Sequence, residues 1–118
     1  MNIEELREYC LSKKEVSEGF PFDEETLVFK VLDKMFLLTN INSELRMNVK
    51  CDPEKALELR ELHSAVLPGY HMNKKYWNTV IIDGSVSDKQ LKAWIDDSYD
   101  QVVGKMTKKK QNELKNLK

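Results

Sequence analysis

The apolar residues of this chain recur with two different periods, and each change of period marks a boundary between elements. Close to the N-terminus the period is helical, with Ile3, Leu6 and Cys10 on one face. Asn2 and Glu5 have the spacing of a capping box, in which each side chain bonds to the backbone of the other residue. The pattern predicts a first helix that ends at about Leu11.

A period of two replaces the helical period in the middle of the chain. Three short β-rich runs lie at 26–32, 35–41 and 44–50, with turn residues between them at Asp33-Lys34 and Asn42-Ser43. They predict an antiparallel meander. The third run alternates apolar and polar residues, as expected when one face of the strand is buried and the other is exposed to solvent. Its apolar face consists of Leu45, Met47 and Val49, and its polar face of Arg46, Asn48 and Lys50.

Segment 16–22, before the meander, is expected to add an edge strand at most, because Pro21 has no N–H group to donate to a central ladder. After the meander, Asp52-Pro53-Glu54 is a typical helix start. Pro68-Gly69 breaks that helix, and 77–83 reads as another strand. The apolar stripe expected for the helix is Ala56, Leu59, Leu62 and Val66.

The last predicted helix begins at a capping box of Ser87 and Gln90 and turns an apolar face inward as far as Met106. Strands grouped between helices and joined by tight turns predict an α+β fold, with helices packed on one face of an antiparallel sheet and the other face largely solvated. We expect a single domain over 1–106. Residues 107–118 keep few apolar anchors and are expected to form a basic, mobile tail.

Composition narrows the class of protein. The chain has 118 residues, 41% of them hydrophobic, which suits one ordinary domain. The longest apolar run, Met35 to Leu38, is too short for a membrane span or a signal-peptide core. Cys10 and Cys51 lie far apart without metal-ligand spacing. We therefore expect a soluble cytoplasmic protein that uses neither a metal nor a cofactor.

Charge is close to balanced over the chain but is unevenly distributed. The formal net charge is −1, yet six lysines and only one acidic residue follow Gly104. The acidic body argues against a strongly basic nucleic-acid binder, so any such binding must come from a local patch. No GxSxG element or glycine-rich phosphate loop occurs in the sequence, and we expect a protein that is not an enzyme.

The segment PGYHMNKKYWNTV, residues 68–80, concentrates polar, basic and aromatic residues in one window. It can be a structural crossing between two elements, in which its aromatic residues pack and its lysines keep it soluble. It can also bind phosphate through basic side chains while its aromatic residues stack. The residues alone favour the structural interpretation.

Two stretches together resemble the MmcQ/YjbR family: GFPFDEETLVFKVLDKMFLL (19–38) and PGYHMNKKYWNTVIIDGSVSDKQLKAWIDDSYDQV (68–102). The likeness extends from Met1 to about Gly104 and includes Pro21-Phe22 and Ser98-Tyr99. Asp33 stands where members often have glycine, and aspartate also tolerates a positive φ. The resemblance implies a frataxin/CyaY-like α+β sandwich and a double-wing, DNA-binding function. That functional description rests largely on analogy between folds.

The leading hypothesis is therefore a small non-enzymatic domain that binds double-stranded DNA through residues 68–78, which we call the signature loop. The candidate contacts are His71, Asn73, Lys74, Lys75, Tyr76 and Asn78, with Arg46 and Lys50 as a second basic element. The alternative is a protein-interaction or small-ligand module in which the same loop forms a pocket wall, using Tyr70, His71 and Trp77.

Overall fold

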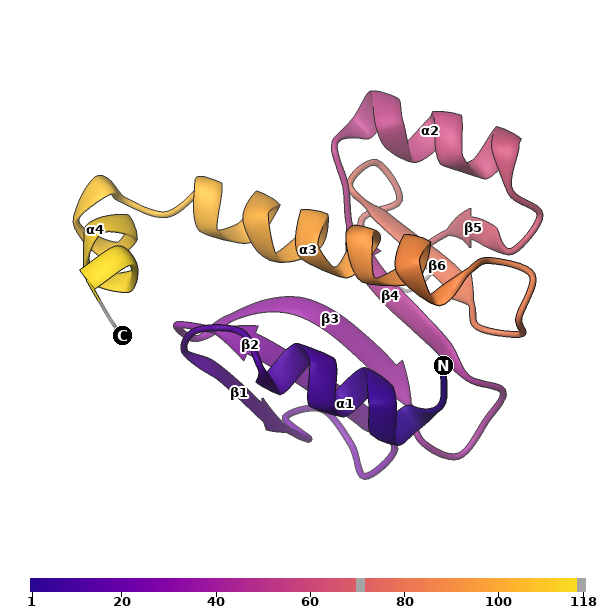
Figure 1. The fold of residues 1–118 in the computed structure, drawn as a ribbon, viewed down its shortest axis with the longest axis horizontal. Helices are drawn as coiled ribbons and strands as arrows, with labels where there is room; N and C mark the ends of the chain where they lie inside the picture. Colours follow the sequence, from indigo (N-terminus) through magenta and orange to yellow (C-terminus); the bar gives the residue numbers. More distant parts are fainter. Residues whose placement is uncertain (70–71, 117–118) are drawn as a thin grey trace.

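A six-stranded sheet organises the molecule (Figure 1). The computed structural model describes residues 1–69 and 72–116. The strands lie in the order β1-β2-β3-β4-β6-β5, and every neighbouring pair is antiparallel. The α+β class is confirmed. The strands are β1 (Val16–Gly19), β2 (Thr26–Val31), β3 (Lys34–Asn40), β4 (Arg46–Lys50), β5 (Val66–Pro68) and β6 (Trp77–Ile81).

The turn between β2 and β3 lies one residue earlier than the sequence predicts. Leu32 and Asp33 both have positive φ, 45° and 69°, which is typical of a two-residue hairpin turn. Lys34 already pairs with Val31, so the turn is Leu32-Asp33 and not Asp33-Lys34. The expectation that Asp33 accepts a positive φ is confirmed. The predicted edge strand is also present: β1 pairs only with β2 and ends before Pro21.

Helices cover one face of this sheet, as predicted (Figure 1). Asn2 and Glu5 form the complete capping box of the first helix, Asp52 caps the second through the Lys55 N–H, and Ser87 caps the third through the Gln90 N–H. Among residues 1–69 and 72–116, no helix is long and apolar enough to cross a membrane. The helices are α1 (Ile3–Leu11), α2 (Pro53–Leu62), α3 (Asp88–Gly104) and α4 (Lys108–Asn116).

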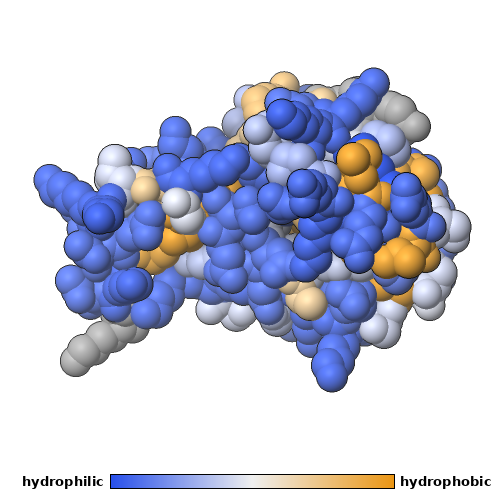
Figure 2. Space-filling view, turned by 90° about the horizontal axis from the view of Figure 1, so that it is seen from above, coloured by the Kyte–Doolittle hydropathy of each residue, from blue (hydrophilic) through white to orange (hydrophobic). Residues whose placement is uncertain are grey.

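Val66 is a correction to the predicted apolar stripe of α2. The helix ends at Leu62, and His63 already has an extended backbone with φ −130° and ψ 120°. Val66 instead opens β5, where it pairs with Val80 and is buried. The prediction that Val66 is buried is therefore confirmed, but its assignment to the helix is wrong. On α2 itself Leu57 and Leu62 stay exposed. Figure 2 shows a mostly hydrophilic face on which apolar side chains gather toward the right of the view.

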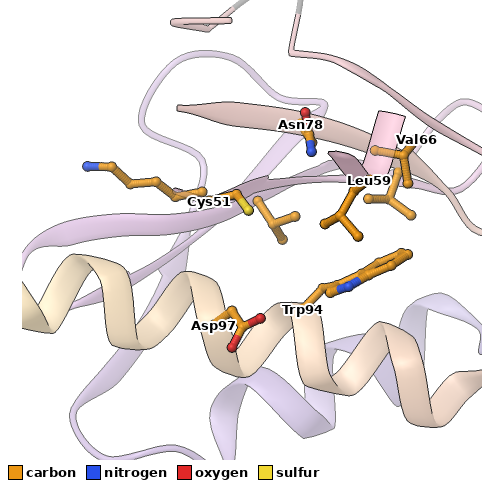
Figure 3. A pocket seen from close by; sticks show the side chains of 9 residues that line it. Cys51, Leu59, Val66, Asn78, Trp94 and Asp97 are labelled. Carbon is orange, nitrogen blue, oxygen red and sulfur yellow. The ribbon is translucent and has the colours of Figure 1, made fainter. Parts of the chain in front are cut away.

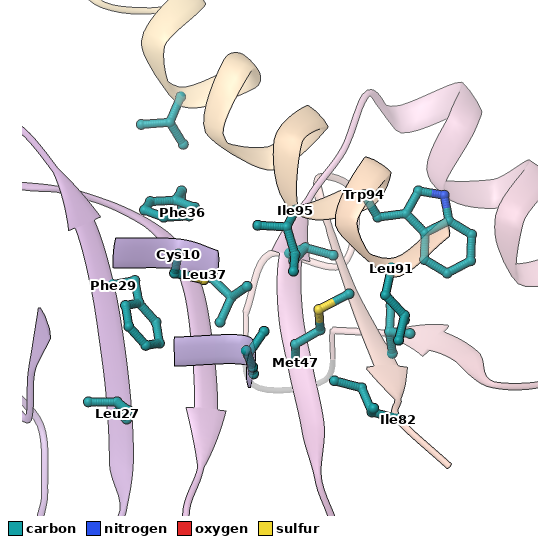
Figure 4. Close-up of a cluster of buried hydrophobic side chains, with 14 of the residues drawn as sticks. Cys10, Leu27, Phe29, Phe36, Leu37, Met47, Ile82, Leu91, Trp94 and Ile95 are labelled. Atoms are coloured by element: carbon teal, nitrogen blue, oxygen red, sulfur yellow. The ribbon is translucent and has the colours of Figure 1, made fainter. Parts of the chain in front are cut away.

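The main core fills the space between the sheet and helices α1 and α3 (Figure 4). Phe29, Phe36 and Leu37 reach it from β2 and β3, and Met47 reaches it from β4. These side chains are fully buried, so their removal from water supplies much of the free energy that holds α3 against the strands. From α3 they meet Leu91, Trp94 and Ile95.

A second apolar cluster lies on the opposite face of the sheet, where the sequence predicted solvent. Val28, Leu38 and Trp77 are buried there, and they share one face because Val28 pairs with Leu38 and Trp77 pairs with Lys50. Met72 and Tyr76, from the segment between β5 and β6, pack against this cluster. Met72 and Tyr76 therefore cover this part of the outer face.

The C-terminal segment is also more ordered than the sequence predicts. Lys108–Asn116 forms the helix α4, and Leu114 is only 6% exposed within the main core cluster. The Gln111 side chain donates to the carbonyl oxygen of Met106 at 2.9 Å, which fixes the joint between α3 and α4. One buried leucine and one side-chain hydrogen bond thus supply the anchors that the sequence analysis found missing.

Leu114→Ala should release α4 without unfolding the domain. Truncation of a buried leucine costs about 2–5 kcal/mol in a core, and here the loss falls on a terminal helix that can detach alone. Hydrogen exchange should show faster exchange in 108–116 and unchanged protection in β3. The exposed Leu57→Ala serves as the control and should change neither. Cooperative loss of protection throughout the sheet would contradict this picture.

Candidate functional site

Four lysines from different segments surround one hollow of about 590 Å³ on the molecular surface. Lys34 begins β3, Lys50 ends β4, Lys105 follows α3, and Lys110 lies in the first turn of α4. No aspartate or glutamate is among its lining residues in the part of the chain that the structure describes. We call this site the lysine hollow. Its other lining residues are Met35, Trp77, Val102, Met106 and Thr107.

Within the lysine hollow, Lys50 is held partly buried and close to a second positive charge. Partial burial lowers the pKa of Lys50, and the nearby positive charge of Lys105 lowers it further. The N-terminus of α4 adds the positive end of a helix dipole beside Thr107. A bound anion would relieve both the repulsion and the desolvation, which makes this arrangement typical of an anion-binding site.

The buried hydroxyl of Ser98 bonds to the strand end that carries Lys50, one of the lysines of the hollow. The register of β3 and β4 pairs Leu37 with Val49, and its continuation would place Phe36 opposite Lys50. Instead the Ser98 hydroxyl accepts the N–H of Lys50 at 2.8 Å and donates to the carbonyl oxygen of Phe36. Ser98 therefore replaces a rung of the ladder and ties α3 to the strand end that carries Lys50.

The signature loop joins the lysine hollow through Tyr76. The ammonium nitrogen of Lys105 lies 4.5 Å from the centroid of the Tyr76 ring, and that of Lys75 lies 5.6 Å from it. Cation–π contacts of this kind hold lysines near an aromatic face. One predicted loop lysine and one C-terminal lysine thus meet at one ring. Trp77, the next residue, forms part of the wall of the hollow.

Arg60, which the sequence analysis overlooked, organises the same loop from the helical side of the sheet. Its Nε donates to the side-chain oxygen of Asn78 at 2.7 Å. Its guanidinium also donates to the carbonyl oxygens of Lys74 and Trp77. The available sequence signal was its position: Arg60 follows Ala56 by one helical turn, beside the apolar stripe of α2.

Pro68-Gly69 does not end α2, as the sequence predicted, because α2 ends at Leu62 and Pro68 ends β5; Gly69 has a steric role instead. A Cβ atom at Gly69 would lie 2.9 Å from both the Cβ and the carbonyl oxygen of Trp77, which is closer than such atoms approach. The Gly69 N–H donates to that same carbonyl at 2.9 Å. Gly69 therefore permits the close approach of backbone that starts the loop and places Trp77.

The structure separates the predicted DNA contacts into two groups. Asn73, Lys74 and Lys75 are exposed, Tyr76 is half-buried beside Lys75, and Lys50 lines the lysine hollow. Asn78 is a correction, since it is only 2% exposed and its amide nitrogen donates to the carbonyl oxygen of Ala56. It faces the helices because residues alternate along β6.

Arg46 is a second correction. It lies at the opposite end of β4 from Lys50, and its guanidinium forms an ion pair with Glu44 at 3.0 Å. It therefore does not join the lysines. The sequence analysis counted both basic residues of β4 as one element, although a five-residue strand holds its ends far apart. Tyr70 and His71 lie outside the described residues.

A narrow space between α3 and the sheet is too small to be a ligand site (Figure 3). Asn78 from β6 and Trp94 and Asp97 from α3 lie on opposite sides of it. Its volume is about 10 Å³. That is at most the room for one water molecule, so this space belongs to the packing of the core.

The cysteines and acidic residues offer little chemistry. Burial raises the pKa of the Cys10 thiol to about 12 and also raises the pKa of Cys51, so neither is a ready nucleophile at neutral pH. Within 1–69 and 72–116, no three residues among His, Cys, Asp and Glu come together as metal ligands. The lysine hollow, in contrast, has a definite chemical preference for anions.

Comparison with known proteins gives consistent results. The family model described as YjbR matches residues 11–101. The Escherichia coli K12 protein YjbR, described as uncharacterized, is 35% identical over 99% of this chain and 100% of its own length. YbdF of Escherichia coli O157:H7, also described as uncharacterized, is 38% identical over 81% of this chain and 80% of its own.

Two solved structures have the same fold. The Deinococcus radiodurans protein DR2400, described with the domain DUF419, superposes with a TM-score of 0.90 and 44% identity, covering 96% of this chain and 87% of its own. A Pseudomonas syringae protein superposes with a TM-score of 0.72 and 27% identity, covering 83% of this chain and 96% of its own. Nothing in these descriptions names a ligand.

Ser98→Ala should destabilise the domain although it removes a single oxygen atom. The N–H of Lys50 and the carbonyl of Phe36 would lose their partner in a buried position, at about 1–3 kcal/mol for each unsatisfied group. Urea unfolding measures the change in the free energy of unfolding. Ser17→Ala, at an exposed position of β1, is the matched control and should stay within about 0.5 kcal/mol of the original chain. Equal free energies of unfolding for the two variants would show that the Ser98 hydroxyl does not stabilise the contact of α3 with β3 and β4.

Arg60→Met should loosen the signature loop while it keeps the length of the side chain. Hydrogen bonds from a charged donor are worth about 1.5–3 kcal/mol, and this substitution removes those that hold Asn78 and the carbonyls of Lys74 and Trp77. Amide exchange in 73–77 should accelerate, whereas Glu61→Gln, at an exposed position beside it, should leave the exchange unchanged. Unaltered exchange in the Arg60 variant would contradict the assigned role.

Proposed function

The chain belongs to the YjbR family, and from its lysine hollow we propose that it is a non-enzymatic DNA-binding domain that contacts backbone phosphates. One observation carries the proposal: Lys34, Lys50, Lys105 and Lys110 converge from four segments of a chain whose net charge is −1. Phosphate contacts position a protein on DNA, and lysine supplies the charge for them.

The neighbouring loop supports the same function. Lys75 reaches the ring of Tyr76 from one side and Lys105 contacts it as well, so positive charge continues from the lysine hollow onto the signature loop. Because the body of the protein is acidic, binding to nucleic acid requires a local basic patch. These lysines form such a patch. Phosphates are exposed on a duplex and on a single strand alike, so these contacts suit either form.

A small anionic ligand is the second candidate, because the volume of about 590 Å³ lies within the usual range for small-molecule sites. Trp77, predicted as a wall of such a pocket, does line the lysine hollow. The two candidates differ in how binding depends on ligand length. DNA bound through several phosphates gains affinity with each added contact, whereas a small ligand fills the hollow alone and would displace DNA completely.

Replacement of hollow lysines should weaken DNA binding and its dependence on salt. With about four phosphate contacts, the logarithm of the affinity should fall against the logarithm of salt concentration with a slope of about −3.6. Lys50→Met and Lys105→Met should each make that slope shallower by about 0.9, as measured by fluorescence anisotropy with labelled DNA. Lys89→Met is the control, because it lies on α3 about 24 Å from Lys105 along the helix axis. Slopes equal to that control would remove the lysine hollow from the DNA interface.

The Lys50 variant carries an internal check on stability. Because the folded-state pKa of Lys50 lies below its ordinary value, the folded protein binds this proton less well than the unfolded chain does. At any pH at which Lys50 is charged in both the folded and the unfolded protein, its charge therefore works against folding. Lys50→Met should keep or raise the melting temperature while DNA affinity falls. A lower melting temperature would mean that the lost affinity reflects lost structure.

A further inference from the structure

We propose that the outer face of the sheet binds a DNA strand with unpaired bases in preference to a duplex, with phosphate in the lysine hollow and a base in a second hollow beside it. This inference rests on the proposed function and narrows its ligand. The second hollow has a volume of about 540 Å³, and we call it the amide hollow. Its lining residues are Phe22, Asp23, Thr26, Met35, Leu38, Thr39, Asn40, Asn48 and Met72.

The two hollows are neighbours on one surface. Met35 lines both of them. Lys50 lines the first and Asn48 the second, and both project from the same face of β4 at a separation of about 7 Å. A single nucleotide can span that separation between its phosphate and its base. A ligand with an anionic part and a neutral, flat part therefore matches this face.

The amide hollow offers hydrogen-bonding groups suited to base edges. The Asn48 side-chain oxygen accepts the Thr79 hydroxyl at 2.6 Å, and the Asn40 side-chain oxygen accepts the Asn42 N–H at 2.8 Å. Within the described part of the chain, neither amide nitrogen donates a hydrogen bond. These NH₂ groups can donate to the acceptor atoms of a base, as asparagine commonly does.

Apolar side chains complete a surface on which a base can stack. Phe22 is 64% exposed where it borders the amide hollow. Met35 and Met72 are partly buried and pack on the cluster around Trp77, which gives a polarisable floor. Aromatic side chains that border a basic groove are the usual means by which proteins hold unpaired bases.

Charge decides which part of the ligand enters which hollow. The backbone N–H groups of Thr26 and Glu25 donate to the Asp23 carboxylate and lower its pKa, so it is ionised at neutral pH. A carboxylate in the amide hollow repels phosphate and can accept the amino group of a base. The lysine hollow has the opposite preference. The phosphate is therefore drawn to the lysines and the base to the amides.

A duplex satisfies only half of this arrangement. Its phosphates can reach the lysine hollow, but its bases are stacked and paired inside the helix and cannot enter the amide hollow without unstacking, which costs a few kcal/mol. An unpaired strand places both parts without that cost. The preference for the strand should therefore depend on the amide hollow, whereas the affinity common to both forms should depend on the lysines.

The test is fluorescence anisotropy with one labelled oligonucleotide, its duplex, and an abasic strand of equal length. The chain should bind the strand more tightly than either other probe. Phe22→Ala should weaken strand binding by roughly 5- to 150-fold, the range for one lost base stack, and leave duplex binding unchanged. Phe20→Ala is the matched control, because Phe20 is also exposed but does not line the hollow. Phe22 is 64% exposed and Phe20 is 46% exposed, and neither belongs to a buried core cluster, so neither variant should disturb the fold.

The outcomes separate this inference from the proposed function. Equal affinity for the strand, the duplex and the abasic strand, with Lys50→Met weakening all three, would overturn the preference for unpaired bases and leave DNA binding intact. Equal effects of Phe22→Ala and Phe20→Ala on strand binding would also overturn it. No saturable binding to any probe at low salt would remove the proposed function and this inference with it.

Discussion

The bond that the Ser98 hydroxyl makes between β3 and β4 is the constraint from which the surface of this protein follows. A serine on α3 accepts the N–H of Lys50 and donates to the carbonyl of Phe36, where the two strands would otherwise bond to each other. The helix is thereby fixed to the sheet at its C-terminal half. Lys105 and the start of α4 come next along the chain, so this polar contact, together with the apolar packing of α3, helps to bring them close to Lys50.

The convergence of lysines costs stability that the rest of the fold must supply. Like charges repel, and the lowered pKa of Lys50 reports both its partial burial and its repulsion from Lys105. Leu114 holds α4 in the core cluster, and Tyr76 gives Lys105 and Lys75 a common aromatic face. Groups kept together at such a cost are expected where a ligand later balances the charge.

The sequence predicted the elements better than their meeting points. The antiparallel order, the capping residues of α1, α2 and α3, and the edge position of β1 follow from local patterns that depend on a few neighbouring residues. The lysine hollow joins the start of β3, the end of β4 and the junction of α3 with α4, which are distant in the chain, and no local pattern contains that information. Lys50 was predicted as a contact because it lies on the solvent-exposed face of β4. Arg46 lies on the same face, but at the end of the strand that is far from the lysine hollow. Ser98 was noticed only as part of a resemblance, because a buried serine has no periodicity.

The signature loop is both a structural crossing and part of a site, and β6 explains why it can be both. Successive residues of a strand point to opposite faces, so Asn78 bonds to Arg60 among the helices while Trp77 is buried on the outer face. Arg60 also holds the carbonyl of Trp77, which couples the loop on one face of the sheet to a helix on the other. Because Arg60 holds the backbone at Trp77, this tryptophan can present a wall to a ligand without the entropy cost of ordering on binding. The packing of Trp77 is therefore what allows it to serve the lysine hollow.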